Sequence, residues 1–239
     1  MKDRLDKVLT ERGLVASRSQ AKSLIEKGDV LVQGKVITKA SESVDSDVEI
    51  SLNAPLYVGR GAFKLEKALS EFKVDVKNLV MLDIGASTGG FTEVLLLHGT
   101  QKVYAIDVGR DQLAKKIRED IRVVSMEGTN IKDVSSLPEL ADGAVIDLSF
   151  ISVTKVLDYV KNLIKENGFA IILVKPQFEA GLDRLPKDGV VKDEILRQTI
   201  LKEVIAFATN GGWSHLQTIT SPIEGKTGNI EFLSFLKRN

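Results

Sequence analysis

The 239-residue chain contains no cysteine, so disulfide bonds and thiolate metal sites are excluded. It has only two histidines, His98 and His215, which lie far apart in the sequence, so a histidine-based metal site is not expected. The apolar runs are short, since even residues 169–174 fall far below the length that spans a bilayer. The amino terminus lacks the apolar core of a secretory signal peptide. We therefore expect a cytoplasmic protein with no bound metal and no membrane partner.

An excess of charge of either sign is also missing. The chain has 33 Lys and Arg against 33 Asp and Glu, so its net charge does not indicate a nucleic-acid partner. It is 43% hydrophobic and 28% charged, which is ordinary for a globular protein. Its length suits one large domain, or one large domain and a small one.

The first fifty residues are expected to form a small α+β unit. Leu5, Val8 and Leu9 recur at helical spacing and mark one apolar face. Ser17 followed by Gln20 is a capping-box pattern that predicts the start of a second helix. Three short strands are predicted after it, at residues 30–32, 36–37 and 48–50.

The remainder of the chain alternates between strand and helix patterns. Strands are predicted at residues 80–84, 102–107, 122–125, 144–147, 169–175, 214–219 and 230–236. Helices are predicted at 61–72, 91–98, 111–118, 153–165 and 194–209, and 176–192 is expected to be irregular. The alternation predicts an α/β fold with a doubly wound, mostly parallel sheet and an antiparallel edge. The predicted domains are residues 1–56 and 57–239, with a linker around 53–60 that includes Asn53-Ala54-Pro55.

A glycine-rich segment follows the first strand of the larger region. The strand ends near Asp83 and runs into Gly85-Ala86-Ser87-Thr88-Gly89-Gly90, where glycines allow a tight turn and close approach to a ligand. The segment has neither the Walker pattern nor a clean Gly-x-Gly-x-x-Gly. Asp107 ends the next strand, 22 residues after Gly85, where a carboxylate can accept both ribose hydroxyls of a nucleoside cofactor. The pattern fits S-adenosylmethionine or a dinucleotide; the alternative is a plain loop with a capping Asp.

Four charged residues stand beside apolar runs at the ends of predicted elements: Lys64, Asp147, Lys175 and Glu231. A buried charge is costly unless it is paired, so two lysines and two carboxylates that converge would neutralise each other. Methyl transfer to a hydroxyl needs the acceptor oxygen positioned and relieved of its proton. Lys175 could act as base or orienter, Asp147 could orient it, and the other two could position a ribose. For any single one of these residues, a surface salt bridge is the alternative interpretation.

Together these segments resemble the TlyA family, whose members are often labelled hemolysin A. The similar segments are Tyr57–Gly61, Lys64–Leu69, Asp83–Thr92, Asp147–Ser152, Lys175–Glu179 and Gly228–Leu233. The family joins an S4-like RNA-binding domain to an FtsJ-like (RrmJ-type) methyltransferase domain with a Rossmann-like fold. The resemblance implies 2′-O-methylation of ribosomal RNA, at cytidine, with S-adenosylmethionine as the cofactor and ribosomal subunits as partners.

The resemblance also implies roles for individual residues. Its Lys-Asp-Lys-Glu catalytic tetrad corresponds to Lys64, Asp147, Lys175 and Glu231. The cofactor-binding positions correspond to Asp83, Gly85, Ser87, Gly89, Gly90, Phe91, Asp107 and Asn130.

Charge in the small unit is less decisive about RNA. Residues 1–39 hold nine Lys and Arg and five Asp and Glu, but residues 40–52 add four acids and no base. RNA affinity would therefore rest on a local patch, for which the candidates are Arg4, Arg18, Lys22, Lys27 and Lys35. Residues 1–52 contain no aromatic residue, so backbone and shape contacts are expected in place of base stacking. The alternative is a solvated helix face.

Three other classes of function remain as alternatives. A membrane-active hemolysin would require an amphipathic or spanning apolar segment and an export route, and the sequence shows neither. A noncatalytic ribosome-binding module would carry a disrupted tetrad or glycine loop, and both are intact. A small-molecule methyltransferase or an NAD enzyme would explain neither the added small domain nor the second lysine.

Overall fold

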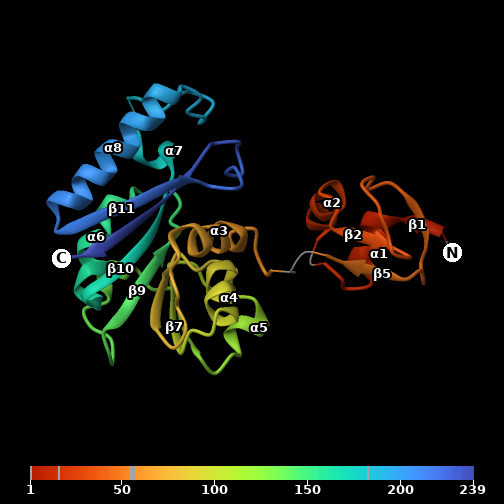
Figure 1. The fold of residues 1–239 in the computed structure, drawn as a ribbon, viewed down its shortest axis with the longest axis horizontal. Coiled ribbons are helices and arrows are strands. Elements are labelled where there is room, and N and C mark those ends of the chain that lie inside the picture. Colours follow the sequence, from red (N-terminus) through yellow and green to blue (C-terminus); the bar gives the residue numbers. More distant parts are fainter. Residues whose placement is uncertain (1, 16, 54–56, 182) are drawn as a thin grey trace. The chain divides into compact units, whose positions relative to one another are not determined.

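The computed structural model describes residues 2–15, 17–53, 57–181 and 183–239. These residues form two compact units, Met1–Val58 and Gly59–Asn239 (Figure 1). Residues 54–56 of the predicted linker, and with them the end of the predicted first domain, lie outside the described residues. Within the described part of the chain, no helix is long and apolar enough to cross a membrane.

The smaller unit packs two helices against short strands. Its elements are β1 (Lys2–Arg4), α1 (Leu5–Glu11), α2 (Arg18–Glu26), β2 (Val30–Val32), β3 (Lys35–Val36), β4 (Ser43–Asp45) and β5 (Ile50–Leu52). Strand β1 pairs antiparallel with β4, and β2 pairs antiparallel with both β3 and β5. Apolar faces of α1 and α2, including Leu5, Leu9 and Ile25, form the core, as the helical spacing predicted.

Two features of this unit differ from the sequence analysis. The third strand, predicted at 48–50, exists but is displaced to Ile50–Leu52, because Val48 N donates to Asp45 O and closes a turn before it. Strands β1 and β4 were not predicted, since three residues are too few to show a period of two. The predicted start of the second helix is confirmed, because Ser17 is its N-cap and its Oγ accepts from Gln20 N at 3.3 Å, whereas the Gln20 side chain donates to Tyr57 O.

The larger unit is a seven-stranded sheet with the order β11-β12-β10-β9-β6-β7-β8. Its strands are β6 (Val80–Ile84), β7 (Lys102–Asp107), β8 (Val123–Glu127), β9 (Ala141–Ile146), β10 (Ile164–Val174), β11 (Trp213–Thr220) and β12 (Phe232–Arg238). Strands β6 to β10 pair in parallel, whereas β12 is antiparallel to both β10 and β11. The predicted parallel sheet with an antiparallel edge is confirmed.

Helices cover both faces of this sheet (Figure 1). They are α3 (Ala62–Phe72), α4 (Gly90–Leu97), α5 (Lys115–Arg118), α6 (Leu157–Leu163), α7 (Pro176–Glu179) and α8 (Glu194–Asn210), with short 3-10 turns at Ile131–Asp133 and Val153–Lys155. Side chains of a strand alternate between faces, so Asp83 meets Thr92 of α4 while Leu82 and Ile84 join the core beneath α6 and α8. The carboxyl ends of the parallel strands therefore emerge between two helical layers.

Three predicted elements need correction. The helix predicted at 111–118 begins only at Lys115, because Asp111 has a left-handed backbone with φ of +55°. The helix predicted at 153–165 splits into a 3-10 turn and α6, and residue 164 already belongs to β10. The segment 176–192, expected to be irregular, opens with α7, in which Pro176 occupies the first turn, where its missing N–H is not needed.

Candidate active site

The glycine-rich segment lies where β6 turns into α4, directly against the end of β9. Gly85 has φ of +86°, and a Cβ there would lie 2.4 Å from the backbone oxygen of Asp147. Gly89 has φ of +92° and packs against Leu113 and Ile117, each 3.0 Å from where its Cβ would be. Only glycine fits this combination of left-handed backbone and close approach. The loop is thereby held beside Asp147.

Gly90 and Phe91 face the start of α3. A Cβ on Gly90 would lie 3.2 Å from the backbone nitrogen of Ala62, and the Phe91 ring is buried beside Gly61. These contacts position α3 against α4 and account for both residue types by packing. Their assignment to cofactor binding stays a prediction.

Asp83 is completely buried at the end of β6. Thr92 Oγ1 donates to its Oδ2, while Oδ1 is buried without a hydrogen-bond partner among the described residues. Burial raises the pKa of this carboxyl from 3.8 to about 7; the Thr92 hydrogen bond opposes the rise and the charge of nearby Asp147 adds to it. An unpartnered buried oxygen at the end of the central strand is a position at which a ligand donor would be stabilised.

Asp107 connects the end of β7 to the glycine loop. Its Oδ2 accepts from Ser87 N at 2.8 Å and its Oδ1 from Gly109 N at 2.7 Å, so both oxygens are fixed and retain free lone pairs. Val108, the next residue, exposes 71% of its surface and was not singled out from the sequence. This arrangement suits the polar ribose and the apolar face of a nucleoside.

Asn130 lies close to the same edge of the sheet. Thr129 N donates to Asp107 O at 2.9 Å, which holds this segment next to β7. The Asn130 side chain is exposed and caps the following 3-10 turn, accepting from Lys132 N at 3.1 Å. Its carboxamide nitrogen remains available for a ligand.

The four charged residues singled out from the sequence form two buried ion pairs. Lys64 Nζ lies 2.6 Å from Glu231 Oε2, and Lys175 Nζ lies 2.6 Å from Asp147 Oδ1. Lys175 Nζ also donates to Ser149 Oγ at 3.0 Å. The side chains of Lys64, Lys175 and Glu231 are nearly inaccessible, and Asp147 is the most exposed of the four. Each buried charge is therefore compensated, as the sequence analysis required.

Both pairs belong to one site. Gln177, two residues after Lys175, donates through Nε2 to Glu231 Oε1 at 3.3 Å. Gly61, one turn before Lys64, lies where a Cβ would be 3.6 Å from Asp147 Oδ2. The strand order explains the meeting, because antiparallel β12 pairs with β10 and brings the start of β12 beside the end of β10.

An exposed aromatic side chain stands beside this site and was not singled out from the sequence. Phe150 exposes 91% of its surface and has φ of +67°, a strained conformation for a bulky residue. Its ring lies 5.2 Å from that of Phe178, which in turn lies 5.7 Å from Lys175 Nζ. An aromatic residue next to a predicted catalytic segment is the sequence signal that could have indicated it.

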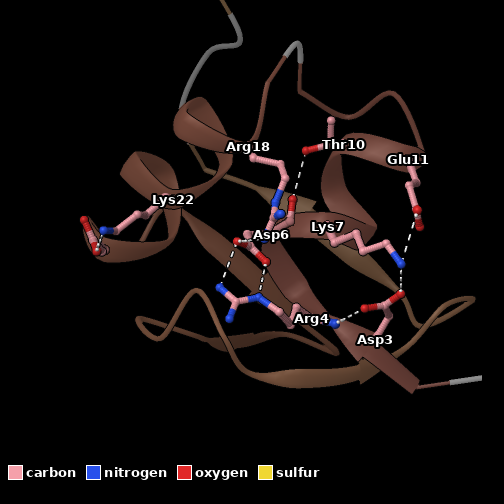
Figure 2. A network of polar contacts seen from close by, with 9 residues as sticks. Asp3, Arg4, Asp6, Lys7, Thr10, Glu11, Arg18 and Lys22 are labelled. Atoms are coloured by element: carbon pink, nitrogen blue, oxygen red, sulfur yellow. Dashed lines mark hydrogen bonds and ion pairs between the residues drawn. The ribbon is translucent and has the colours of Figure 1, made fainter.

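In the smaller unit, two of the five predicted RNA-binding cations meet through a carboxylate (Figure 2). Arg4 donates through Nε and Nη2 to Asp6 at 3.0 Å each, and Arg18 Nη2 donates to Asp6 Oδ2 at 2.9 Å. The two hydrogen bonds from Arg4, with the one from Arg18, lower the pKa of the buried Asp6 carboxyl to about 2 against the effect of burial. Both guanidinium groups are thus held in place while their side chains stay half exposed.

The other three predicted cations have exposed side chains. Lys22 is exposed on α2, and its Nζ lies 3.6 Å from Glu26 Oε1. Lys27 is exposed at the end of α2, and Lys35 is exposed in β3.

Across residues 2–15, 17–53, 57–181 and 183–239, no group of three or more metal-ligating side chains could hold a metal ion.

Comparison with known proteins adds family relationships to this geometry. Residues 57–238 match the FtsJ-like methyltransferase family, and residues 3–50 match the S4 domain. The chain is 44% identical to "Hemolysin A" of Brachyspira hyodysenteriae, across 97% of this chain and 98% of that one. It is 39% identical to "16S/23S rRNA (cytidine-2'-O)-methyltransferase TlyA" of Mycobacterium tuberculosis, across 98% and 89%. A solved structure of a "Putative hemolysin" from Streptococcus thermophilus is 40% identical, with a TM-score of 0.77 over 100% of this chain and 89% of that one.

Proposed function

Because this chain belongs to the FtsJ-like methyltransferase family and carries an S4 domain, we propose that it methylates ribosomal RNA on a ribose 2′-hydroxyl. The observation that carries the proposal is the pair of buried Lys–carboxylate contacts beside a glycine-rich loop. The named activity of the Mycobacterium tuberculosis relative supports cytidine as the target.

The loop residues fit S-adenosylmethionine as the methyl donor. Asp83 offers an unpartnered buried oxygen for an ammonium group, Asp107 offers fixed carboxylate oxygens for ribose hydroxyls, and Val108 offers apolar surface for an adenine. Asn130 could donate to the same base. When bound, S-adenosylmethionine supplies an electrophilic methyl group and leaves as a neutral thioether.

Lys175 is the residue that we expect to meet the acceptor hydroxyl. Lys175 would orient the acceptor oxygen, and any role as base requires it to be the neutral amine when it takes the hydroxyl proton. Asp147, 2.6 Å away, would stabilise the ammonium formed in that step. Ser149 accepts a hydrogen bond from the same nitrogen and fixes its direction. Asp147 would also favour the positive charge of the methyl donor.

Lys64 and Glu231 would hold the ribose. Their ion pair is nearly inaccessible, and Gln177 fixes the second oxygen of Glu231, so the pair is rigid before substrate arrives. A rigid donor and acceptor at this place would orient the ribose hydroxyls toward Lys175.

Phe150 offers a stacking face for the target base. A base inside a helix cannot bring its ribose to a buried lysine, so the nucleotide must be unstacked or single-stranded. An exposed ring within 5.2 Å of Phe178, itself near Lys175, would replace the lost stacking. Arg4 and Arg18, held by Asp6, would contact the phosphate backbone elsewhere on the RNA. With ribosomal RNA as its substrate, the protein would act on ribosomal subunits in the cytoplasm.

The direct test incubates purified protein with unmethylated ribosomal subunits, or their naked RNAs, and radiolabelled S-adenosylmethionine. We expect label on a ribose, located by mass mapping, and its loss in Lys175→Ala. The matched control is Lys165→Ala, because Lys165 also lies 2.6 Å from a carboxylate, Asp142, between the same two strands but at their opposite ends. Cofactor binding by the wild type without label on any ribosomal RNA would contradict the proposed substrate. Full activity of Lys175→Ala would contradict the role of Lys175.

A further inference from the structure

We propose that Glu179 is a positioning residue that holds Phe150 in place for the target nucleotide without touching the substrate itself. The inference rests on the proposed function, since it deepens the account of how that site receives RNA. It concerns two loops that leave the carboxyl ends of neighbouring strands: residues 147–153 after β9, and residues 175–179 after β10.

Glu179 anchors the far end of the first loop. Its Oε1 accepts from Val153 N at 2.8 Å, and its Oε2 accepts from Ser152 Oγ. Ser152 Oγ in turn accepts from Thr154 N at 3.2 Å and caps the 3-10 turn that follows. Burial raises the pKa of Glu179 while these two donors lower it, which is the balance expected of a desolvated carboxylate with specific partners.

The near end of the same loop is held by the second loop as well. Lys175 Nζ contacts Asp147 Oδ1 and donates to Ser149 Oγ. Phe150 therefore lies between two anchors, one at Ser149 and one at Ser152, and both come from the segment 175–179. A short loop fixed at both ends leaves its middle residue few backbone conformations.

This clamping accounts for the unusual state of Phe150. A phenylalanine with φ of +67° is strained, and a strained residue persists only when its surroundings enforce it. Burial of the side chain does not offset this strain, because the side chain is 91% exposed. Its ring contacts that of Phe178, which immediately precedes Glu179. Glu179 thus acts on an exposed aromatic ring through the backbone of the loop, by way of Ser152 and Val153.

The alternative is that Glu179 only stabilises the fold, as a partly buried carboxylate with a backbone partner would. A matched control separates the two. Asp142 is also a carboxylate that accepts a backbone N–H at 2.8 Å, from Val80, but it lies near the start of β9, at the opposite end of that strand. Asp142→Ala removes a comparable contact and leaves the loop 147–153 untouched.

The test combines kinetics with a double-mutant cycle. We expect Glu179→Ala to lower kcat/KM for RNA by between about fivefold and about a hundredfold, the range of one lost base–aromatic stack. The affinity for S-adenosylmethionine should be unchanged, and Asp142→Ala should keep full kcat/KM. In a Phe150→Ala background, Glu179→Ala should lower kcat/KM by a further factor of less than about two, since both changes remove the same contact.

Two milder variants guard against loss of the fold. Glu179→Gln keeps an acceptor for Val153 N–H and should retain most activity. Ser152→Ala keeps Glu179 but removes the hydroxyl that donates to it and caps the 3-10 turn, and it should lower kcat/KM in the same direction as Glu179→Ala. A crystal structure of either Glu179→Ala or Ser152→Ala should show Phe150 outside the left-handed region. This readout needs no activity, so it tests the positioning role even if wild-type protein fails to methylate RNA.

Opposite results overturn the inference. They are an unchanged Phe150 conformation in both variant structures, a fully additive loss in the Phe150→Ala background, or a loss of cofactor affinity equal to the loss of kcat/KM. Failure of the wild type to methylate any ribosomal RNA would instead refute the proposed function.

Discussion

Lys64 and Glu231, which are 167 residues apart in the chain, meet at 2.6 Å in a nearly inaccessible ion pair. One partner lies in the first helix of the larger unit and the other just before its last strand. The pair therefore joins the two ends of this unit at the site where the parallel strands finish.

Removal of one partner of this pair should be strongly destabilising. Glu231→Ala leaves the Lys64 ammonium buried without compensation, and we expect a loss of about 3–5 kcal/mol in the free energy of unfolding. Urea denaturation, monitored by circular dichroism, measures this loss. The control is Lys67→Ala, since Lys67 pairs with Glu71 on the exposed side of the same helix and should change stability little. Equal losses in the two variants would refute the argument from burial.

Gly85→Ala should abolish cofactor binding. The new Cβ would lie 2.4 Å from the Asp147 backbone oxygen, so the glycine loop or the end of β9 must move. Gly189→Ala is a matched control, because Gly189 also has positive φ, of +71°, but nothing lies within 4 Å of its Cβ position. Isothermal titration with S-adenosylmethionine should show binding lost only in Gly85→Ala. Normal binding by that variant would contradict the close approach.

Stability should depend on pH through Asp83. Its pKa rises from 3.8 to about 7 on folding, so between these values the folded protein keeps a proton that the unfolded chain has lost. The stability that the protonated carboxyl gives the folded protein is fully present below pH 3.8 and is lost as pH rises through about 7. Asp83→Asn keeps an acceptor for Thr92 but cannot titrate. We expect the wild type to lose stability relative to Asp83→Asn between pH 4 and about 7.5; a difference that is constant across this range would contradict the raised pKa.

Phe150→Gly should separate stability from activity. Glycine adopts φ of +67° without strain, so the variant should be as stable as the wild type or more stable by about 1 kcal/mol. Its kcat/KM for RNA should fall because the stacking face is gone, and Phe150→Tyr should preserve it. Thermal melts and initial rates on the same preparations check both parts. A destabilised Phe150→Gly would show that the ring contributes to packing after all.

Arg18→Ala should weaken RNA binding without changing which sequence is bound. Arg18 is held by Asp6 with its side chain half exposed, and a lost phosphate contact reduces the slope of log K against log salt by about 1. Filter binding at several salt concentrations measures this slope. Lys77→Ala, which removes an exposed lysine of the larger unit, is the control. An unchanged slope in Arg18→Ala would place the RNA contact elsewhere.

Much of the larger unit could be predicted from local pattern. Strands β6 and β7 have the bounds predicted for them, because buried parallel strands are continuous apolar runs that end at glycine, polar or charged residues. Features that depend on the backbone conformation of one residue, or on pairing with a distant strand, could not be predicted in this way. The left-handed Asp111 shortens α5, and three-residue strands such as β1 exist only because a partner strand lies beside them.

Residue types and spacing were enough to indicate that Lys64, Asp147, Lys175 and Glu231 belong together, because charges beside apolar runs must find partners when they are buried. Which neighbours complete the site depended on the tertiary structure. Phe150 and Glu179 each lie in a segment that the sequence makes conspicuous, but neither segment indicates contact with the other. Their relation arises only because β9 and β10 are neighbours whose loops meet at one edge of the sheet. Backbone strain and hydrogen bonds between distant loops are properties of that meeting, and no single stretch of sequence contains them.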